Sequence, residues 1–179
     1  SHGNRDACIF SEFGERWTWH QLAQKVDQLS AGLLALGIYK GDRVGIWSPN
    51  RPEWVLTQFA TARIGAILVN INPAYRRTEL EYALAKVDAK ALITAVSFKT
   101  SNYLEMLQDL APELRGCRPG QLSAVRFPSL KSIIHMGDND VEGMFRFKDI
   151  MMHDNAGQRA RLDAIGRMLS AVDAINLQF

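Results

Sequence analysis

The sequence predicts an α/β fold in which a doubly wound, mostly parallel sheet carries helices on both faces. Residues 18–94 alternate three times between a helical and a strand-like apolar pattern. Gly37, Gly41, Gly65 and the pair Asn72-Pro73 mark the joints between these segments. The strand-like segments are continuous apolar runs, as expected when both faces of a sheet are covered. Parallel strands joined by helices cross over with a right-handed sense, so a doubly wound sheet follows.

A small antiparallel hairpin is predicted before the sheet. A short apolar run at residues 7–10 is followed by a turn at Gly14 and an edge-like segment at residues 16–18.

The first helix is predicted to start after Thr18, a good N-cap residue. Gln21 lies three residues later and completes a capping box. Apolar residues then recur at steps of three and four, which predicts one buried stripe: Trp19, Leu22, Val26, Leu29, Leu33 and Leu36. Gly37 stands where a left-handed C-cap is expected.

Two strand–helix pairs follow a turn at residues 41–43. Residues 44–47 form a short strand, and Pro52 at a first helical position opens a helix that Gly65 closes. Residues 66–71 form the next strand.

Asn72-Pro73 ends that strand, because proline has no N–H to donate and restricts the residue before it. Thr78 and Glu81 then predict a second capping box, and residues 91–96 a third strand. Loops at the carboxyl ends of parallel strands are where ligands bind, but we expect Asn72-Pro73 to shape the strand end. We likewise expect structural roles for the glycines, with Gly37 and Gly65 as helix caps and Gly41 in a turn.

The remaining residues continue the same pattern less regularly. We expect a helix capped by Ser101 and ended by Pro112, then a loop, a strand, a polar turn, a helix and a final strand. The loop is expected at residues 113–129, the strand at 131–136 and the polar turn at 137–143. The second helix is expected at 158–169 and the final strand at 174–179. No linker or repeat interrupts the chain, so residues 1–179 are predicted to be one partial domain.

Composition narrows the function classes. The chain is 47% hydrophobic and 22% charged, with a net charge of +2, which is ordinary for a globular domain and argues against nucleic-acid binding. Basic residues gather at Arg115, Arg118, Arg126 and Lys131, which we interpret as a solvated loop. No apolar run approaches the length of a membrane span. Cys8 and Cys117 are predicted to be free thiols.

Motifs for familiar chemistry are missing. The sequence has no G-x-G-x-x-G, no G-x-x-x-x-G-K-[ST] and no G-x-S-x-G. Its four histidines are scattered, without metal-ligand spacing, and we expect surface or hydrogen-bonded core roles for them: His2, His20, His135 and His153. No catalytic, cofactor-binding or metal-binding residue is therefore assigned.

One segment partly matches a calcium-binding loop. Asp138, Asp140 and Glu142 fall at positions 1, 3 and 5 of an EF-hand-like loop, with Gly143 at position 6. Asp149 falls at position 12, which is usually a glutamate. Arg146 stands at the ninth position, however, and the preceding segment is strand-like rather than helical. A solvated acidic turn is the favoured interpretation.

The amino-acid sequence of residues 18–94 resembles the N-terminal region of the AMP-forming acyl-CoA synthetases, which belong to the adenylate-forming superfamily. The matching stretches are TWHQL at 18–22, GLLALGI at 32–38, KGDRVGI at 40–46 and ARIGAILVNINP at 62–73, followed by EL at 79–80 and KALI at 90–93. Further stretches are similar to the fatty-acyl (medium-chain type) CoA ligases: NPAY at 72–75, ELEY at 79–82, FKT at 98–100 and PG at 119–120.

This resemblance implies a ligase that activates a fatty or related carboxylic acid with MgATP and passes the acyl group to coenzyme A. In the family, the strand corresponding to residues 175–179 leads into a Ser/Thr/Gly-rich loop that wraps the ATP phosphates. The catalytic motifs lie further on, so none is assigned to a residue of this sequence. The chain is expected to be an N-terminal portion of the large domain, inactive by itself and without tight binding of ATP, Mg²⁺ or coenzyme A.

A second hypothesis is a non-catalytic α/β module that binds a nucleotide or a protein. Either hypothesis leaves an exposed strand edge, which favours self-association. We expect a cytoplasmic location, with the mitochondrial matrix as the alternative in a eukaryote.

Overall fold

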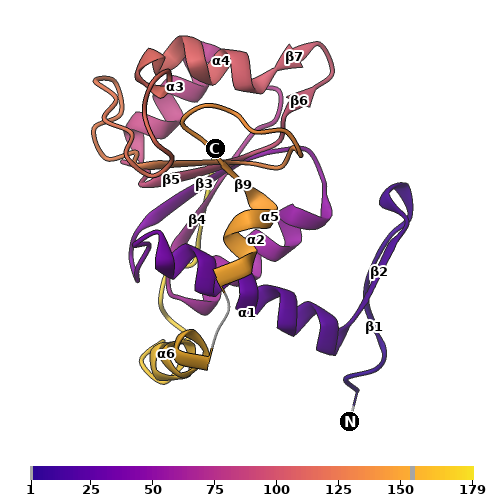
Figure 1. Ribbon diagram of the computed structural model, residues 1–179. Coiled ribbons are helices and arrows are strands. Elements are labelled where there is room, and N and C mark those ends of the chain that lie inside the picture. The colour runs from indigo at the N-terminus through magenta and orange to yellow at the C-terminus, as the bar shows by residue number, and fades with distance from the viewer. Residues whose placement is uncertain (1, 154–155) are drawn as a thin grey trace.

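The computed structural model describes residues 2–153 and 156–179, which form a central parallel sheet covered by helices on both faces (Figure 1). The strands are β1 Asp6–Phe10, β2 Glu15–Thr18, β3 Arg43–Trp47, β4 Ile67–Ile71, β5 Ala91–Thr94, β6 Ser97–Phe98, β7 Ser101–Asn102, β8 Ser132–His135, β9 Phe145–Arg146 and β10 Asn176–Gln178. The helices are α1 Trp19–Ala35, α2 Pro52–Arg63, α3 Arg77–Lys86, α4 Tyr103–Leu110, α5 Phe147–Ile150 and α6 Ala156–Gly166.

The main sheet has the strand order β10-β4-β3-β5-β8-β9, and every neighbouring pair is parallel. The chain passes from β3 to β4 on one side and then returns to β5 on the other side of β3. This reversal confirms the predicted doubly wound sheet. The predicted hairpin is also present, because β1 and β2 pair antiparallel, and it stands away from the body in Figure 1.

The helices form two layers with separate cores. One layer contains α3 and α4, whose buried side chains include Leu80, Leu84 and Leu107 and pack against one sheet face. The other contains α1, α2 and α5, and there Leu29 and Leu33 of α1 are fully buried. Each buried leucine removes enough apolar surface from water to contribute about 2 kcal/mol.

Helices on the α1 side of the sheet meet one another at close contacts. Arg63 of α2 reaches both neighbouring helices, with its Nε 3.1 Å from an Asp27 carboxylate oxygen and its Nη2 3.1 Å from one of Asp163. Gly32 of α1 lies against the backbone of Ile150 in α5, so closely that a Cβ built there would stand 2.0 Å from the Ile150 carbonyl oxygen. Glycine is required at this crossing for space alone.

Several local predictions are confirmed. The capping box of α1 is formed, since Gln21 N–H donates to Thr18 Oγ1 at 3.3 Å and Thr18 N–H donates to Gln21 Oε1 at 2.9 Å. Gly37, Gly41 and Gly65 all have positive φ, between 73° and 86°, at helix ends or in a turn.

Other local predictions are wrong. Helix α3 begins earlier than expected, with Arg76 as its N-cap and Glu79 Oε2 accepting from the Arg76 N–H at 3.1 Å. The predicted box partner Glu81 instead pairs with Arg126. Helix α4 is capped by Asn102 rather than Ser101, and Asn102 Oδ1 accepts from the Glu105 N–H at 3.2 Å.

The predicted stripe of α1 also needs one correction. Trp19 is 52% exposed, because it is the first residue of the helix and precedes the turns that dock on the sheet. Strand β9 and helix α5, at residues 145–150, were not expected from the sequence. Strands β5 and β10 are shorter than predicted. Helix α6 ends earlier than predicted.

Candidate functional site

The carboxyl ends of the parallel strands identify the candidate site. In open α/β sheets, ligands bind outside this edge, near the point at which the strand order reverses. Here the reversal lies beside β3, whose carboxyl end is Trp47 and Ser48. A cavity of about 530 Å³ opens next to it, lined by Ser48, Pro49, Asn50, Trp54, Asn70, Ile71, Asn72, Pro73, Phe98 and Phe179. We call this the edge cavity.

The Asn72-Pro73 turn forms one wall of the edge cavity and is held by contacts on two sides. Asn72 Oδ1 accepts from the Ala74 N–H at 2.9 Å, which closes the turn locally. The Tyr103 hydroxyl of α4 donates to the Pro73 carbonyl. The Tyr103 ring stacks on Trp47, with ring centroids 3.5 Å apart and an angle of 8° between the planes. These contacts agree with the expectation that the pair shapes the strand end.

A ladder of amide side chains runs from the edge cavity across to β10 and α2. Asn70 Nδ2 donates to Asn176 Oδ1 at 3.1 Å, and Asn176 Nδ2 donates to Gln58 Oε1 at 2.9 Å. Asn70 Oδ1 is shielded from solvent and has no hydrogen-bond partner among the described residues. The sequence analysis did not single out Asn70, although an amide inside an apolar strand run was a usable signal.

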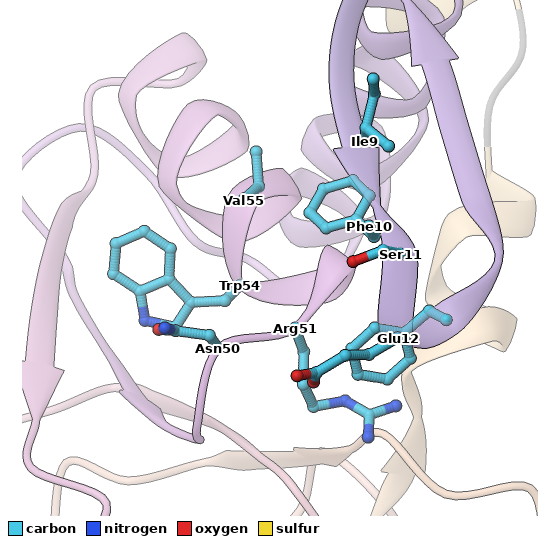
Figure 2. A pocket seen from close by; sticks show the side chains of 9 residues that line it. Ile9, Phe10, Ser11, Glu12, Asn50, Arg51, Trp54 and Val55 are labelled. Atoms are coloured by element: carbon cyan, nitrogen blue, oxygen red, sulfur yellow. The ribbon is translucent and has the colours of Figure 1, made fainter.

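A second pocket, of about 380 Å³, lies between the hairpin and the start of α2 and shares Asn50 and Trp54 with the edge cavity (Figure 2). Figure 2 shows Phe10 on the hairpin side and Val55 on the α2 side. Arg51 is the cation of this pocket. It is already paired, with Nε and Nη2 at 3.1 and 2.9 Å from the two Glu53 carboxylate oxygens.

The chemistry of the edge cavity follows from its lining. Three aromatic rings and three asparagines can hold a flat or apolar group and hydrogen-bond to it. None of the ten lining residues carries an ionisable side chain. Transfer chemistry at a phosphate requires a metal ion or cations against the developing charge, so these residues alone do not supply it.

Comparison with known proteins settles the family. The sequence profile described as AMP-binding enzyme matches residues 1–144. The chain belongs to the AMP-binding enzyme family.

Relatives of the chain are much longer than it is. Over 176 residues it is 41% identical to the mitochondrial medium-chain acyl-CoA ligase ACSF2 of Danio rerio, covering 98% of this chain and 29% of that protein. The ligase of the same name from Homo sapiens is 40% identical over 176 residues, with 98% of this chain and 28% of that protein covered. The chain therefore spans less than a third of the length of these relatives.

Solved structures agree on the fold. The anthranilate CoA ligase AuaEII in complex with anthranoyl-AMP superposes with a TM-score of 0.68 at 26% identity, over 84% of this chain and 25% of that one. A fatty acyl CoA synthetase of Mycobacterium tuberculosis also reaches a TM-score of 0.68, over 97% of this chain and 29% of that one. Because the two sequences are only 18% identical, this similarity is evidence for a shared fold and for nothing further.

The aspartate side chains of residues 138–149 form ion pairs with basic residues of the same segment. Lys148 Nζ is 2.9 Å from Asp138 Oδ1, and this hydrogen bond lowers the pKa of the Asp138 carboxyl. Arg146 lies 3.2 Å from Asp140 and 2.6 Å from Asp149. Among the residues that the structure describes, no group of three or more His, Cys, Asp or Glu side chains is arranged to hold a metal ion.

The other singled-out residues are dispersed. His20 is exposed, His135 is buried, and the His153 side chain lies outside the described residues. Cys8 and Cys117 are free thiols, and burial raises the pKa of both. The basic residues between positions 115 and 131 are exposed, as predicted. In the described part of the chain, no helix is long and apolar enough to cross a membrane.

Proposed function

We propose that the protein containing this chain is an AMP-forming ligase that joins a fatty acid of medium-chain type to coenzyme A. The acid's carboxylate attacks the α-phosphorus of MgATP, forming the acyl-adenylate and releasing pyrophosphate. The thiol of coenzyme A then attacks the acyl carbonyl and releases AMP. The observation that carries the proposal is the 41% identity to a named medium-chain acyl-CoA ligase over 98% of the chain.

The position of β10 next to the edge cavity supports the proposal. Strand β10 pairs with β4 in register, and Phe179 just beyond it lines the edge cavity together with Asn70 and Asn72. A phosphate-binding loop following β10, as the resemblance implies, would start beside this cavity. The family match favours this ligase over the alternative of a free-standing binding module.

We further propose that residues 1–179 form one partial domain that supplies this scaffold and no catalytic group. The edge cavity has no cation and no carboxylate to hold a triphosphate or Mg²⁺. The 179-residue chain is therefore expected to bind ATP, Mg²⁺ and coenzyme A weakly and to show no turnover.

Self-association of the chain is a related proposal. Strand β10 pairs only with β4 in the described sheet. Leu177 within the strand is 41% exposed, and Ile175 just before it is 44% exposed. An unpaired apolar edge favours pairing with a second copy. Light scattering over a dilution series should show concentration-dependent dimers, and a Leu177→Lys variant should stay monomeric. A monomer at every concentration would contradict this proposal.

We also propose a cytoplasmic location, or the mitochondrial matrix if the source is eukaryotic. The vertebrate relatives carry the word mitochondrial in their names, which supports the second location for a eukaryotic source.

The activity is tested on the full-length protein that contains these residues. Release of AMP from ATP is measured with fatty acids of short, medium and long chain, each with and without coenzyme A. We expect AMP release that needs both an acid and coenzyme A, and that is fastest with medium-chain acids. Release that is independent of the acid, or absent with every acid, would contradict the proposal.

A further inference from the structure

His135 is the buried ionisable group for which the proposed function gives no role. It ends β8 at the carboxyl edge of the sheet and is 1% exposed. Its Nδ1 accepts a hydrogen bond from the Gly137 N–H at 3.2 Å, so the ring is neutral and carries its proton on Nε2. That Nε2 is buried and has no partner among the described residues.

The backbone after β8 is fitted closely against this ring. A Cβ on Gly137 would stand 3.2 Å from His135 Nδ1 and 2.7 Å from Val96 Cγ2, so residue 137 has no space for a side chain. The segment then turns and returns as β9, where Arg146 pairs in register with His135. The imidazole therefore binds the beginning of the 136–146 segment, and the backbone of His135 pairs with its end.

The charged residues that affect His135 lie on β9, on the turn before it and on α5. Arg146 of β9 lowers the pKa of His135, while Asp140 of the turn and Asp149 of α5 raise it. Burial has a larger effect than any of these charges and also lowers it. The strand on its other side, β5, brings Thr94 next to it in register and contains no ionisable residue.

We propose that His135 is a pH-sensitive latch that holds the 136–146 segment closed against the carboxyl edge of the sheet. A protonated imidazole cannot accept from the Gly137 N–H, so the hydrogen bond at Nδ1 is replaced by two donors that face each other. The added charge is also buried next to the Arg146 guanidinium, without an acceptor for Nε2–H. Protonation therefore favours an open segment in which the imidazole reaches water.

The direction of the pH dependence follows from the sign of the shift. In the closed segment the pKa of His135 lies below its ordinary value of 6.5. The closed state thus binds fewer protons than the open state as the pH falls below this value. Closure is fully favoured above about pH 6.5 and is lost progressively as the pH falls towards and through the lower pKa of the closed state.

Hydrogen exchange at the Gly137 amide tests the latch on the 179-residue chain without any substrate, so the result is independent of the ligase assignment. We expect the protection factor of Gly137, corrected for the intrinsic rate, to fall by up to ~10-fold between about pH 7.5 and about pH 5.5. The Gly41 amide, which donates to the Gly65 carbonyl at 2.8 Å, should keep its protection.

Two variants and one control separate the latch from general acid sensitivity. His135→Gln keeps a neutral acceptor at all pH values and should abolish the pH dependence at Gly137. Arg146→Gln removes the neighbouring positive charge, brings the pKa of His135 in the closed segment nearer to its ordinary value and should make the acid-induced fall in Gly137 protection smaller. His20→Gln changes an exposed histidine and should behave as the wild type does.

The latch is overturned by a Gly137 protection factor that does not change with pH, or by His135→Gln opening as the wild type does. An NMR titration of the His135 ring gives an independent reading if a variant fails to fold. A ring pKa at or above 6.5 in the wild-type chain would also overturn it.

Discussion

Replacement of Gly32 by alanine gives a test in which helix propensity and packing predict opposite signs. Gly32 lies inside α1, where alanine is intrinsically better than glycine by about 1 kcal/mol. If propensity alone mattered, Gly32→Ala would stabilise the fold. The structure predicts that it destabilises it, because the new Cβ meets the backbone of Ile150.

The size of the effect can be worked from the contact at the crossing. The added Cβ would lie 2.0 Å from the Ile150 carbonyl oxygen and 2.7 Å from its carbon, whereas ordinary contact begins at 3.4 Å. Helices α1 and α5 must then separate by about 1.4 Å, the difference between 3.4 and 2.0 Å. A gap of this size loses a quarter or more of each dispersion contact across the crossing. Leu29 of α1 and Phe147 of α5 belong to the buried cluster on this side of the sheet. Overpacking costs about 1–3 kcal/mol, and a clash with backbone atoms belongs to the upper part of this range, about 2–3 kcal/mol. A net loss of about 1–2 kcal/mol therefore remains after the helix gain of about 1 kcal/mol.

Urea unfolding followed by tryptophan fluorescence measures this difference. Ala35→Gly is the matched control, since Ala35 is exposed in the last turn of the same helix. It should lose up to about 1 kcal/mol from propensity alone. A Gly32→Ala variant as stable as the wild type, or more stable, would refute the packing argument.

Three further changes probe single contacts, each by urea unfolding. Thr18→Ala removes the side-chain acceptor for Gln21 N–H and should cost about 1 kcal/mol; an unchanged midpoint would contradict the cap. Tyr103→Phe removes the hydrogen bond to the Pro73 carbonyl and should cost about 1 kcal/mol near neutral pH. Burial raises the pKa of Tyr103 above its ordinary value of 10, so wild-type stability should fall as the pH rises above about 10, and the variant should fall less steeply. Gly65→Ala places a side chain at a φ of +73° and should cost about 1–2 kcal/mol; no loss would contradict the assigned backbone geometry.

Helices and strands with a regular apolar pattern over many residues were predictable from the sequence. The stripe from Leu22 to Leu33 identifies α1, because burial of one helix face repeats every three or four residues. Strands β3, β4 and β5 were found as apolar runs between glycine joints, since both sheet faces are covered.

Features fixed by only a few residues were not predictable in the same way. Two residues pair in β9, and their pairing depends on β8 rather than on a local pattern. At α3, Thr78 and Glu81 match the capping-box pattern, but the helix starts earlier, with the Arg76 N–H donating to Glu79 and with Glu81 paired to Arg126. Local signals alone could not distinguish these starts.

The sequence predicted only that a site would lie at the carboxyl edge of the parallel sheet. The rule that ligands bind at the carboxyl ends of parallel strands pointed to Asn72-Pro73, and this pair lines the edge cavity. Trp54 and Phe98 complete the cavity from segments that are distant in sequence. Their convergence depends on strand order, and the sequence analysis gave no order beyond the doubly wound class.

The central proposal is that the full-length protein is an acid-activating ligase, of which this chain supplies scaffold and none of the groups that handle the triphosphate. ATP–pyrophosphate exchange, measured side by side on the full-length protein and on the 179-residue chain, tests it most directly. We predict exchange that depends on a fatty acid for the full-length protein and no exchange above background for the chain. Robust exchange by the chain itself, or none by the full-length protein with any acid, would contradict the claim.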